Sequence, residues 1–244
     1  MANKKLLYET GAKKVYEGES DDQVLYVFND NFIAADGSQK GKVKGKAAMN
    51  NTISSQIFEY LESYNILTHF ISKVNEKEMQ VKRTEVLPIN IIISNATDKN
   101  LSKRFGLEDG ELLSSPIIEY YYENEKFKNP LVNESHLRAL KLITEEEVHY
   151  LERTISKTNV VLKSFFERRN LILVRLNLQL GRYKSHLLVG DEITADTCQF
   201  WDTDSDQSID KDVYNIDKGN IEEIYVSPGE KVEKDRLMVR IVKL

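Results

Sequence analysis

The stretch LILVRLNLQLG, residues 171–181, alternates apolar and polar side chains and is the starting point for the fold. Every second residue from Ile172 to Leu180 is apolar, whereas Arg175, Asn177 and Gln179 occupy the positions between them. This period of two predicts a strand with one buried face. The polar row has two interpretations: a plain solvated surface, or a catalytic row whose charges have been exchanged for neutral groups.

A helix and a hairpin flank this strand. The preceding segment EVHYLERTISKTNVVLKSFFERR repeats apolar residues with a helical period, and Thr144 with Glu147 predicts a capping box at its start. The helix is expected to bury a stripe made up of Val148, Leu151, Ile155, Leu162 and Phe165 or Phe166. After the strand, a polar turn at Gly181–Ser185 and the segment HLLVGDE predict a β-hairpin.

The first third of the chain favours strands around one helix. KKVYEGESDDQVLYVFND predicts two strands around a turn at Glu17–Gln23. MNNTISSQIFEYLESYN predicts a helix capped by one of the residues 50–52, and Pro88 interrupts the strand segment that follows. The order predicts an α+β chain with a β-rich lobe at 1–90 and a mixed lobe at 91–215.

Composition excludes several classes of protein. The chain has 244 residues, of which 41% are hydrophobic and 30% charged, and its formal net charge is -5, so nucleic acid is not an expected partner. A single cysteine, Cys198, excludes an intrachain disulfide or a cysteine metal cage, and it is expected to be a small buried filler. No apolar run is long enough to span a membrane and no signal peptide is recognised, so we expect a cytoplasmic protein.

Several motifs then point to one family. LLYETGAKKVYEG opens the chain, NPLVNESH lies at 129–136, and LLVGDEITADTCQFWD at 187–202 is followed by IDKDVYN at 209–215. In this order they resemble the SAICAR synthetase family, which joins aspartate to a carboxylated aminoimidazole ribonucleotide using ATP and magnesium. The resemblance runs from about Leu6 to Asn215 and implies a two-lobed α+β fold with nucleotide between the lobes.

Part of the functional set that the resemblance implies is retained. It assigns Lys13, Lys82 and Asp191 to nucleotide binding, with Asp191 also holding the metal. The substrate-binding residues that it implies are Asp36, Asn133 and Glu134. ATP and Mg²⁺ are therefore expected ligands if this residual site is functional.

Other positions of the family pattern have changed. Asn177 stands where the family has the lysine that assists phosphoryl transfer, and Gln179 stands where it has a carboxylate that helps to bind the metal nucleotide. Arg175 reverses the sign of an aspartate, and Gly11 replaces a lysine. Further departures are Asn90, Ser94, Lys99, Asn100, Asn129, Gln199 and Asn215.

Three functions follow as alternatives. The losses favour a diverged paralogue that no longer makes SAICAR and acts as a non-catalytic binding or regulatory subunit. The second is an ATP-dependent ligase retooled for a substrate that lacks a ribose phosphate. The third is a working SAICAR synthetase in which basic residues elsewhere replace the lost ones, the candidates being Lys99, Lys103, Arg104 and Arg175.

The last 29 residues, 216–244, differ from the family pattern. GNIEEIYVSPGEKVEKDRLMVRIV has short apolar runs around a Pro228-Gly229 turn and no helical period. It resembles half of a biotinyl/lipoyl-type domain without the modified-lysine half. Because a half-barrel leaves open strand edges, this tail is predicted to pair with a second copy of the chain or with another protein.

Overall fold

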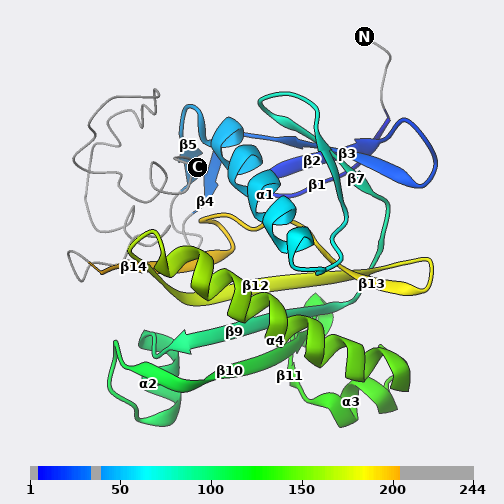
Figure 1. Cartoon of the computed structure of the whole chain (residues 1–244). Helices are drawn as coiled ribbons and strands as arrows, with labels where there is room; N and C mark the ends of the chain where they lie inside the picture. The colour runs from blue at the N-terminus through cyan, green and yellow to red at the C-terminus, as the bar shows by residue number, and fades with distance from the viewer. Residues whose placement is uncertain (1–4, 34–39, 204–244) are drawn as a thin grey trace.

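The computed structural model describes residues 5–33 and 40–203, which form two antiparallel sheets with helices laid against them (Figure 1). The five-stranded sheet has the order β1-β2-β3-β7-β6. Its strands are β1 (Leu6–Glu9), β2 (Lys13–Glu17), β3 (Gln23–Phe28), β6 (Phe70–Lys73) and β7 (Glu78–Lys82). A separate two-stranded ribbon joins β4 (Asn31–Ile33) to β5 (Lys40–Lys42).

The seven-stranded sheet is organised around one long strand, β12 (Leu171–Tyr183). Its main order is β11-β10-β9-β12-β13, and two further strands, β8 and β14, also pair with β12. The other members are β8 (Glu85–Val86), β9 (Ile89–Ala96), β10 (Leu112–Tyr122), β11 (Leu131–Val132), β13 (His186–Gly190) and β14 (Cys198–Asp202). The predicted α+β class is therefore confirmed.

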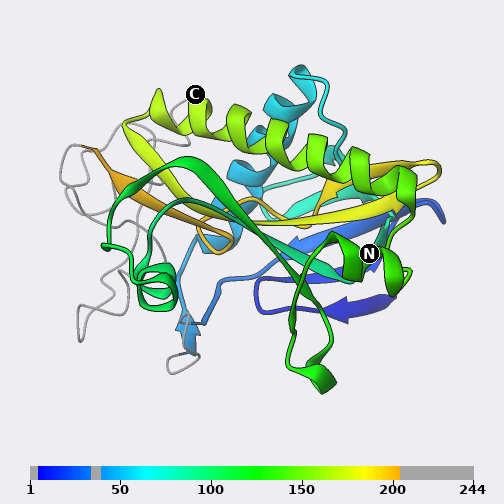
Figure 2. The same ribbon diagram turned by 90° about the horizontal axis from the view of Figure 1, so that it is seen from below.

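Two long helices cover these sheets. α1 (Lys46–Ser63) packs against β3, β6 and β7, whereas α4 (Glu145–Glu167) lies along β12. Figure 2 shows both helices on the same side of the molecule. Three short helices complete the described chain: α2 (Lys99–Phe105), the 3-10 helix η1 (Glu125–Phe127) and α3 (Glu134–Ala139). No helix within residues 5–33 and 40–203 is long and apolar enough to cross a membrane.

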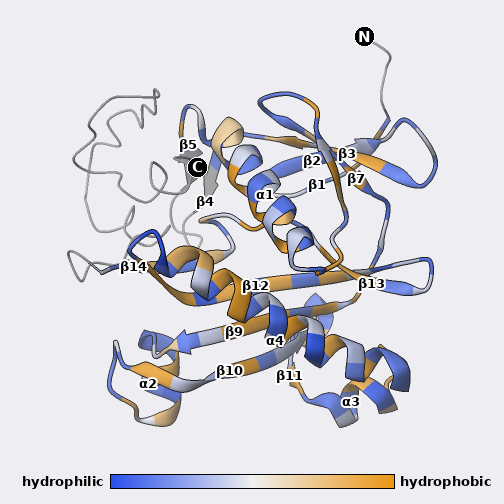
Figure 3. Cartoon of the chain, in the orientation of Figure 1, coloured by the Kyte–Doolittle hydropathy of each residue, from blue (hydrophilic) through white to orange (hydrophobic). Residues whose placement is uncertain are grey.

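The alternation along β12 changes phase at a bulge. In the pairing with β14, Leu173 faces Phe200 and Arg175 faces Gln199, so Val174 is an extra residue. Leu171 and Leu173 are buried before the bulge, whereas every second residue from Leu176 to Leu180 is buried after it. The prediction that Ile172 belongs to the main buried row was wrong, because a sequence pattern cannot register one extra residue. Figure 3 shows the mixed hydropathy of this strand.

The predicted start of α1 was also wrong. The helix begins at Lys46 rather than after one of the residues 50–52, because Lys46, Ala47 and Ala48 are good helix formers. Its N-cap is Gly45, which has a left-handed φ of 87° and makes no side-chain cap. The asparagines expected as caps lie inside the helix instead. The Asn51 amide donates to three backbone carbonyls of the segment 75–78.

Other local predictions are confirmed. Thr144 and Glu147 form the capping box of α4, and all the residues of its predicted buried stripe are buried. Pro88 separates β8 from β9, and Cys198 is a buried filler, with burial raising the pKa of its thiol to about 12. The predicted turn at Gly181–Ser185 is shorter, because β12 continues to Tyr183.

The segment before β6 links the two sheets. The Val189 N–H donates to the Leu67 carbonyl at 2.9 Å, and the His69 N–H donates to the Val189 carbonyl at 2.9 Å. The Lys82 N–H in turn donates to the His69 carbonyl at 2.7 Å. Buried apolar side chains of both sheets accordingly form one continuous core.

The lobe boundaries stay predictions. β9 begins at Ile89, so this strand crosses the expected division between 1–90 and 91–215. Asp36 and the tail at 216–244 lie outside the residues that the structure describes.

Gly181 provides a test of packing where β12 passes β8. A Cβ added to Gly181 would lie 2.5 Å from Thr84 Oγ1 and 2.6 Å from Thr84 Cβ. We expect Gly181→Ala to lower the free energy of unfolding by about 1–3 kcal/mol in urea denaturation, because the clash forces side chains or backbone to shift. The matched control is Gly41→Ala, where an added Cβ meets nothing within 4 Å. Adding Thr84→Gly to Gly181→Ala should restore much of the loss, and equal stability of the two single variants would contradict the clash.

Candidate functional site

Lys13 is the centre of a buried charge cluster between the two sheets. Its side chain, at the start of β2, is only 2% exposed. The ammonium Nζ lies 2.5 Å from Asp191 Oδ1 and 3.1 Å from Glu192 Oε2. Residues 178 positions apart in the chain are thus joined, because Asp191 and Glu192 follow the end of β13 and lie against the start of β2.

The electrostatics keep this lysine charged. Burial disfavours the ammonium, but the charges of Asp191 and Glu192 outweigh that effect and raise the pKa of Lys13 above its ordinary value. Burial also raises the pKa of Glu192. Asp191 differs from its neighbour because its side chain is 32% exposed, so it can still meet a ligand.

The loop after β13 brings a second ion pair to the same region. Asp191 itself has a left-handed φ of 60°, and the Ile193 N–H donates to Ser54 Oγ at 3.1 Å. Asp196 pairs with the Lys46 ammonium and accepts a hydrogen bond from Asn50 Nδ2 at 2.8 Å. The first turns of α1 are thereby tied to the loop that carries the carboxylates.

Asn177 and Gln179 of the β12 polar row border this loop. The Asn177 N–H donates to the Thr197 carbonyl at 2.8 Å, and its buried side-chain oxygen Oδ1 has no hydrogen-bond partner within the described ranges. Gln179 pairs with Gly190, the residue before Asp191, and donates from Nε2 to Glu123 Oε2 at 3.1 Å.

Arg175, the third member of the row, points to different partners. Its Nη1 lies 3.2 Å from Asp98 Oδ2, and Asp98 also caps α2. Among the basic residues considered as replacements, Lys99 and Lys103 lie on α2, and Arg104 of the same helix is paired with Glu119. The basic residues therefore gather around α2.

Lys82 and His69 lie beside the cluster. Lys82 Nζ donates to the Thr68 carbonyl at 2.9 Å, so its ammonium holds the segment that links the sheets. His69 is 1% exposed, and burial lowers the pKa of its imidazole to about 3. Its ring packs edge-on to Tyr26 and Phe58, with centroid distances of 5.4 and 5.0 Å.

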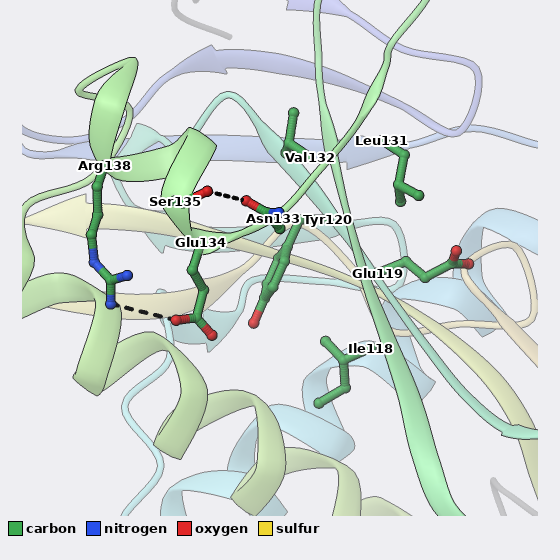
Figure 4. A pocket seen from close by; sticks show the side chains of 9 residues that line it. All are labelled: Ile118, Glu119, Tyr120, Leu131, Val132, Asn133, Glu134, Ser135 and Arg138. Carbon is green, nitrogen blue, oxygen red and sulfur yellow. Dashed lines mark hydrogen bonds and ion pairs between the residues drawn. The ribbon is translucent and has the colours of Figure 1, made fainter.

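Asn133 and Glu134 belong to a separate pocket of about 540 Å³, shown in Figure 4. Asn133 caps α3 by accepting from the His136 N–H, and its Oδ1 also accepts from Ser135 Oγ at 2.7 Å. The Glu134 carboxylate points toward Arg138 at 3.4 Å. Both side chains make local contacts, and none of the residues lining this pocket belongs to the Lys13 cluster.

Four residues of the region had not been proposed as site residues: Glu123, Lys46, Asp196 and His69. Lys46 lies in KGKAAMNN, which is not among the motifs that carry the family resemblance. Glu123 has no local signal, since it lies in the short link between β10 and the 3-10 helix η1. Partial burial and the negative charge of Asp191 raise the pKa of its carboxyl.

The donor set fits a magnesium nucleotide better than a bare metal ion. Within the described part of the chain, no group of three or more His, Cys, Asp or Glu side chains could hold an ion alone. Mg²⁺ usually binds through one or two carboxylates together with substrate phosphates. Asp191, Glu123 and the unpaired Asn177 oxygen supply hard oxygen donors of that kind.

Comparison with known proteins gives one consistent family. The SAICAR synthetase family model matches residues 6–232. A phosphoribosylaminoimidazole-succinocarboxamide synthase from Clostridium novyi is 39% identical over 223 residues, which cover 91% of this chain and 95% of that protein. The synthase of the same name from Chlorobium limicola is 39% identical over 220 residues, covering 90% and 93%.

Solved structures agree with the sequence comparison. The synthase from Ehrlichia chaffeensis superposes with a TM-score of 0.82 at 33% identity, covering 86% of this chain and 91% of that one. A SAICAR synthetase in complex with ADP gives a TM-score of 0.81 at 35% identity, covering 87% and 91%. Since sequence and fold agree over most of both chains, this protein belongs to the SAICAR synthetase family.

Proposed function

We propose that this chain is an ATP-dependent ligase of the SAICAR synthetase type, which forms an amide between a substrate carboxylate and the amine of aspartate. The observation that carries this proposal is the convergence of Lys13, Asp191 and the β12 residues Asn177 and Gln179 at one place. Similarity over about nine-tenths of the chain to proteins named as synthases supports it. The expectation of a non-catalytic paralogue finds no such support, because the relatives compared here are all named as enzymes.

The site's own groups suit the first half of such a reaction. Transfer of the terminal phosphoryl group of ATP to a carboxylate is catalysed chiefly by positioning and by charge stabilisation. The ammonium of Lys13 would face the phosphates once a ligand competes for Asp191. Asp191 would hold Mg²⁺, which when bound neutralises phosphate charge. The amine of aspartate then displaces phosphate, which leaves an amide, ADP and inorganic phosphate.

A second candidate is a binding or regulatory subunit without catalysis. Three observations favour it: Asn177 and Gln179 are neutral, and Arg175 is paired with Asp98 rather than facing the cluster. A ligase for a substrate without a ribose phosphate is the remaining alternative, supported by Ser94 and Asn100 in the sequence. Pairing of the 216–244 tail with another chain stays a prediction.

A coupled assay for ADP release separates these candidates. With ATP, Mg²⁺, aspartate and the carboxylated aminoimidazole ribonucleotide, we expect ADP release that requires both co-substrates and an amide product identified by mass spectrometry. Asp191→Asn should reduce this rate at least tenfold, because the site loses a full charge. Binding of ADP by calorimetry without any turnover would favour the regulatory subunit. ADP release that proceeds with aspartate and a non-phosphorylated carboxylate would favour the retooled ligase.

A further inference from the structure

Glu123 lies where it can complete the carboxylate set around Asp191. It follows the last residue of β10, and its backbone N–H donates to the Pro88 carbonyl at 2.9 Å, which fixes the chain at this point. Its side chain is partly exposed to solvent and accepts a hydrogen bond from Gln179 Nε2 at 3.1 Å. Gln179 pairs across the hairpin with Gly190, so Glu123, Gln179 and Asp191 are successive neighbours.

The hydrogen bond from Gln179 Nε2 to Glu123 orients the Glu123 carboxylate. A glutamine has no charge to offer a cation, but its amide N–H can hold a neighbouring carboxylate in one orientation. The side-chain nitrogen is directed at Glu123. The buried Oδ1 of Asn177, one step along the same face of β12, supplies a further oxygen without a partner within the described residues.

We infer that Glu123 is the second carboxylate ligand of the divalent cation that accompanies the nucleotide, in the place that the neutral Gln179 leaves open. This inference rests on the proposed function and names a residue for the same site. Glu123 follows β10 and Asp191 follows β13, and Gln179 contacts Glu123 and pairs with the residue before Asp191. Two carboxylates with phosphate oxygens and water satisfy the oxygen preference of Mg²⁺.

The first measurement is calorimetric titration with ADP, with and without Mg²⁺. We expect Mg²⁺ to tighten ADP binding to the wild-type chain, and Glu123→Gln to lose about tenfold or more of that gain, since weaker outer-shell changes already cost 10–100-fold. Metal-free ADP binding should stay the same. Glu125→Gln, an exposed acid two residues away, is the matched control. Full retention of the Mg²⁺ effect in Glu123→Gln would overturn the inference.

A double variant that exchanges the side chains of Glu123 and Gln179 tests whether Glu123 acts only through its hydrogen bond. In the double variant Glu123→Gln with Gln179→Glu, one carboxylate and one amide remain on the two sides of the same hydrogen bond. We expect it to recover most of the Mg²⁺ effect that Glu123→Gln loses. No recovery, together with a wild-type unfolding curve, would count against a ligand role for this pair.

Titration with Mn²⁺ alone, followed by water proton relaxation, separates this inference from the proposed function. If ADP does not bind the wild-type chain, the ligase proposal fails, yet Mn²⁺ binding that weakens about tenfold in Glu123→Gln would still support the cation site. If ADP binds and neither Mg²⁺ nor Mn²⁺ distinguishes Glu123→Gln from the wild type, the inference fails and the ligase proposal stands.

Discussion

Replacing Lys13 with methionine is expected to lower the free energy of unfolding by about 3–5 kcal/mol, the usual cost of breaking a buried ion pair. The substitution keeps an unbranched side chain that is one heavy atom shorter, and it removes the ammonium that Asp191 and Glu192 share at 2.5 and 3.1 Å. Glu192 is 5% exposed, so water cannot replace the lost partner. Urea denaturation followed by circular dichroism measures the change.

The neighbouring lysine gives a matched control. Lys14 is 43% exposed and lies 3.5 Å from Glu9, so Lys14→Met should change stability by less than about 1 kcal/mol. Adding Glu192→Gln to Lys13→Met should recover part of the loss, because one uncompensated carboxylate is then removed. If Lys13→Met unfolds within 1 kcal/mol of the wild type and the double variant is no different, the cluster contributes little to folding.

Restoring a lysine at position 177 is expected to raise the rate of ATP-dependent amide formation by about a hundredfold or more. One preorganised donor aimed at the charge that develops in the transition state is worth about 10²–10³ in rate. Asn177 lies beside the loop that carries Asp191, and its own oxygen is unpaired, so a lysine ammonium there would find acceptors nearby. The kcat of Asn177→Lys in the ADP-release assay measures the effect.

The control variant Asn177→Met separates the effect of the lysine's charge on kcat from the effect of a longer side chain. It should leave kcat at or below the wild-type value, because it fills the same space without a positive charge. The ADP affinity of both variants should be compared, since a gain in kcat/KM that comes only from tighter nucleotide binding would argue against a transfer role. An unchanged kcat in Asn177→Lys would mean that position 177 does not face the phosphates in this chain.

The sequence predicted the elements that depend on local patterns. The capping box of α4 and its buried stripe followed from residues three or four apart, where helix geometry is decisive. The hairpin that carries Asp191 followed from alternation and a polar turn. The start of α1 did not follow, because the asparagines that read as caps are used for tertiary hydrogen bonds inside the helix.

The candidate site was predictable only in part. Lys13, Asp191, Asn177 and Gln179 came from the family pattern, and the structure brings Lys13 to Asp191 and borders their loop with the β12 row. Glu123 could not be found in the same way, since nothing in the segment YYENEK indicates a distant partner. Substrate binding by Asn133 and Glu134 stays a prediction, and in this structure Asn133 caps α3 while Glu134 pairs with Arg138.

The sequence by itself determined the α+β class, the amphipathic faces and the family, because periodicity, caps and motifs are properties of neighbouring residues. Only the tertiary structure decided which charges meet. Lys13 from β2 and Asp191 after β13 meet because the Leu67–His69 segment joins the two sheets through backbone hydrogen bonds. Glu123 after β10 reaches the same region within the seven-stranded sheet, where Gln179 of β12 lies between it and the end of β13. The pairing of neighbouring strands depends on their register. The single extra residue at Val174 is enough to shift which side chains of β12 are buried.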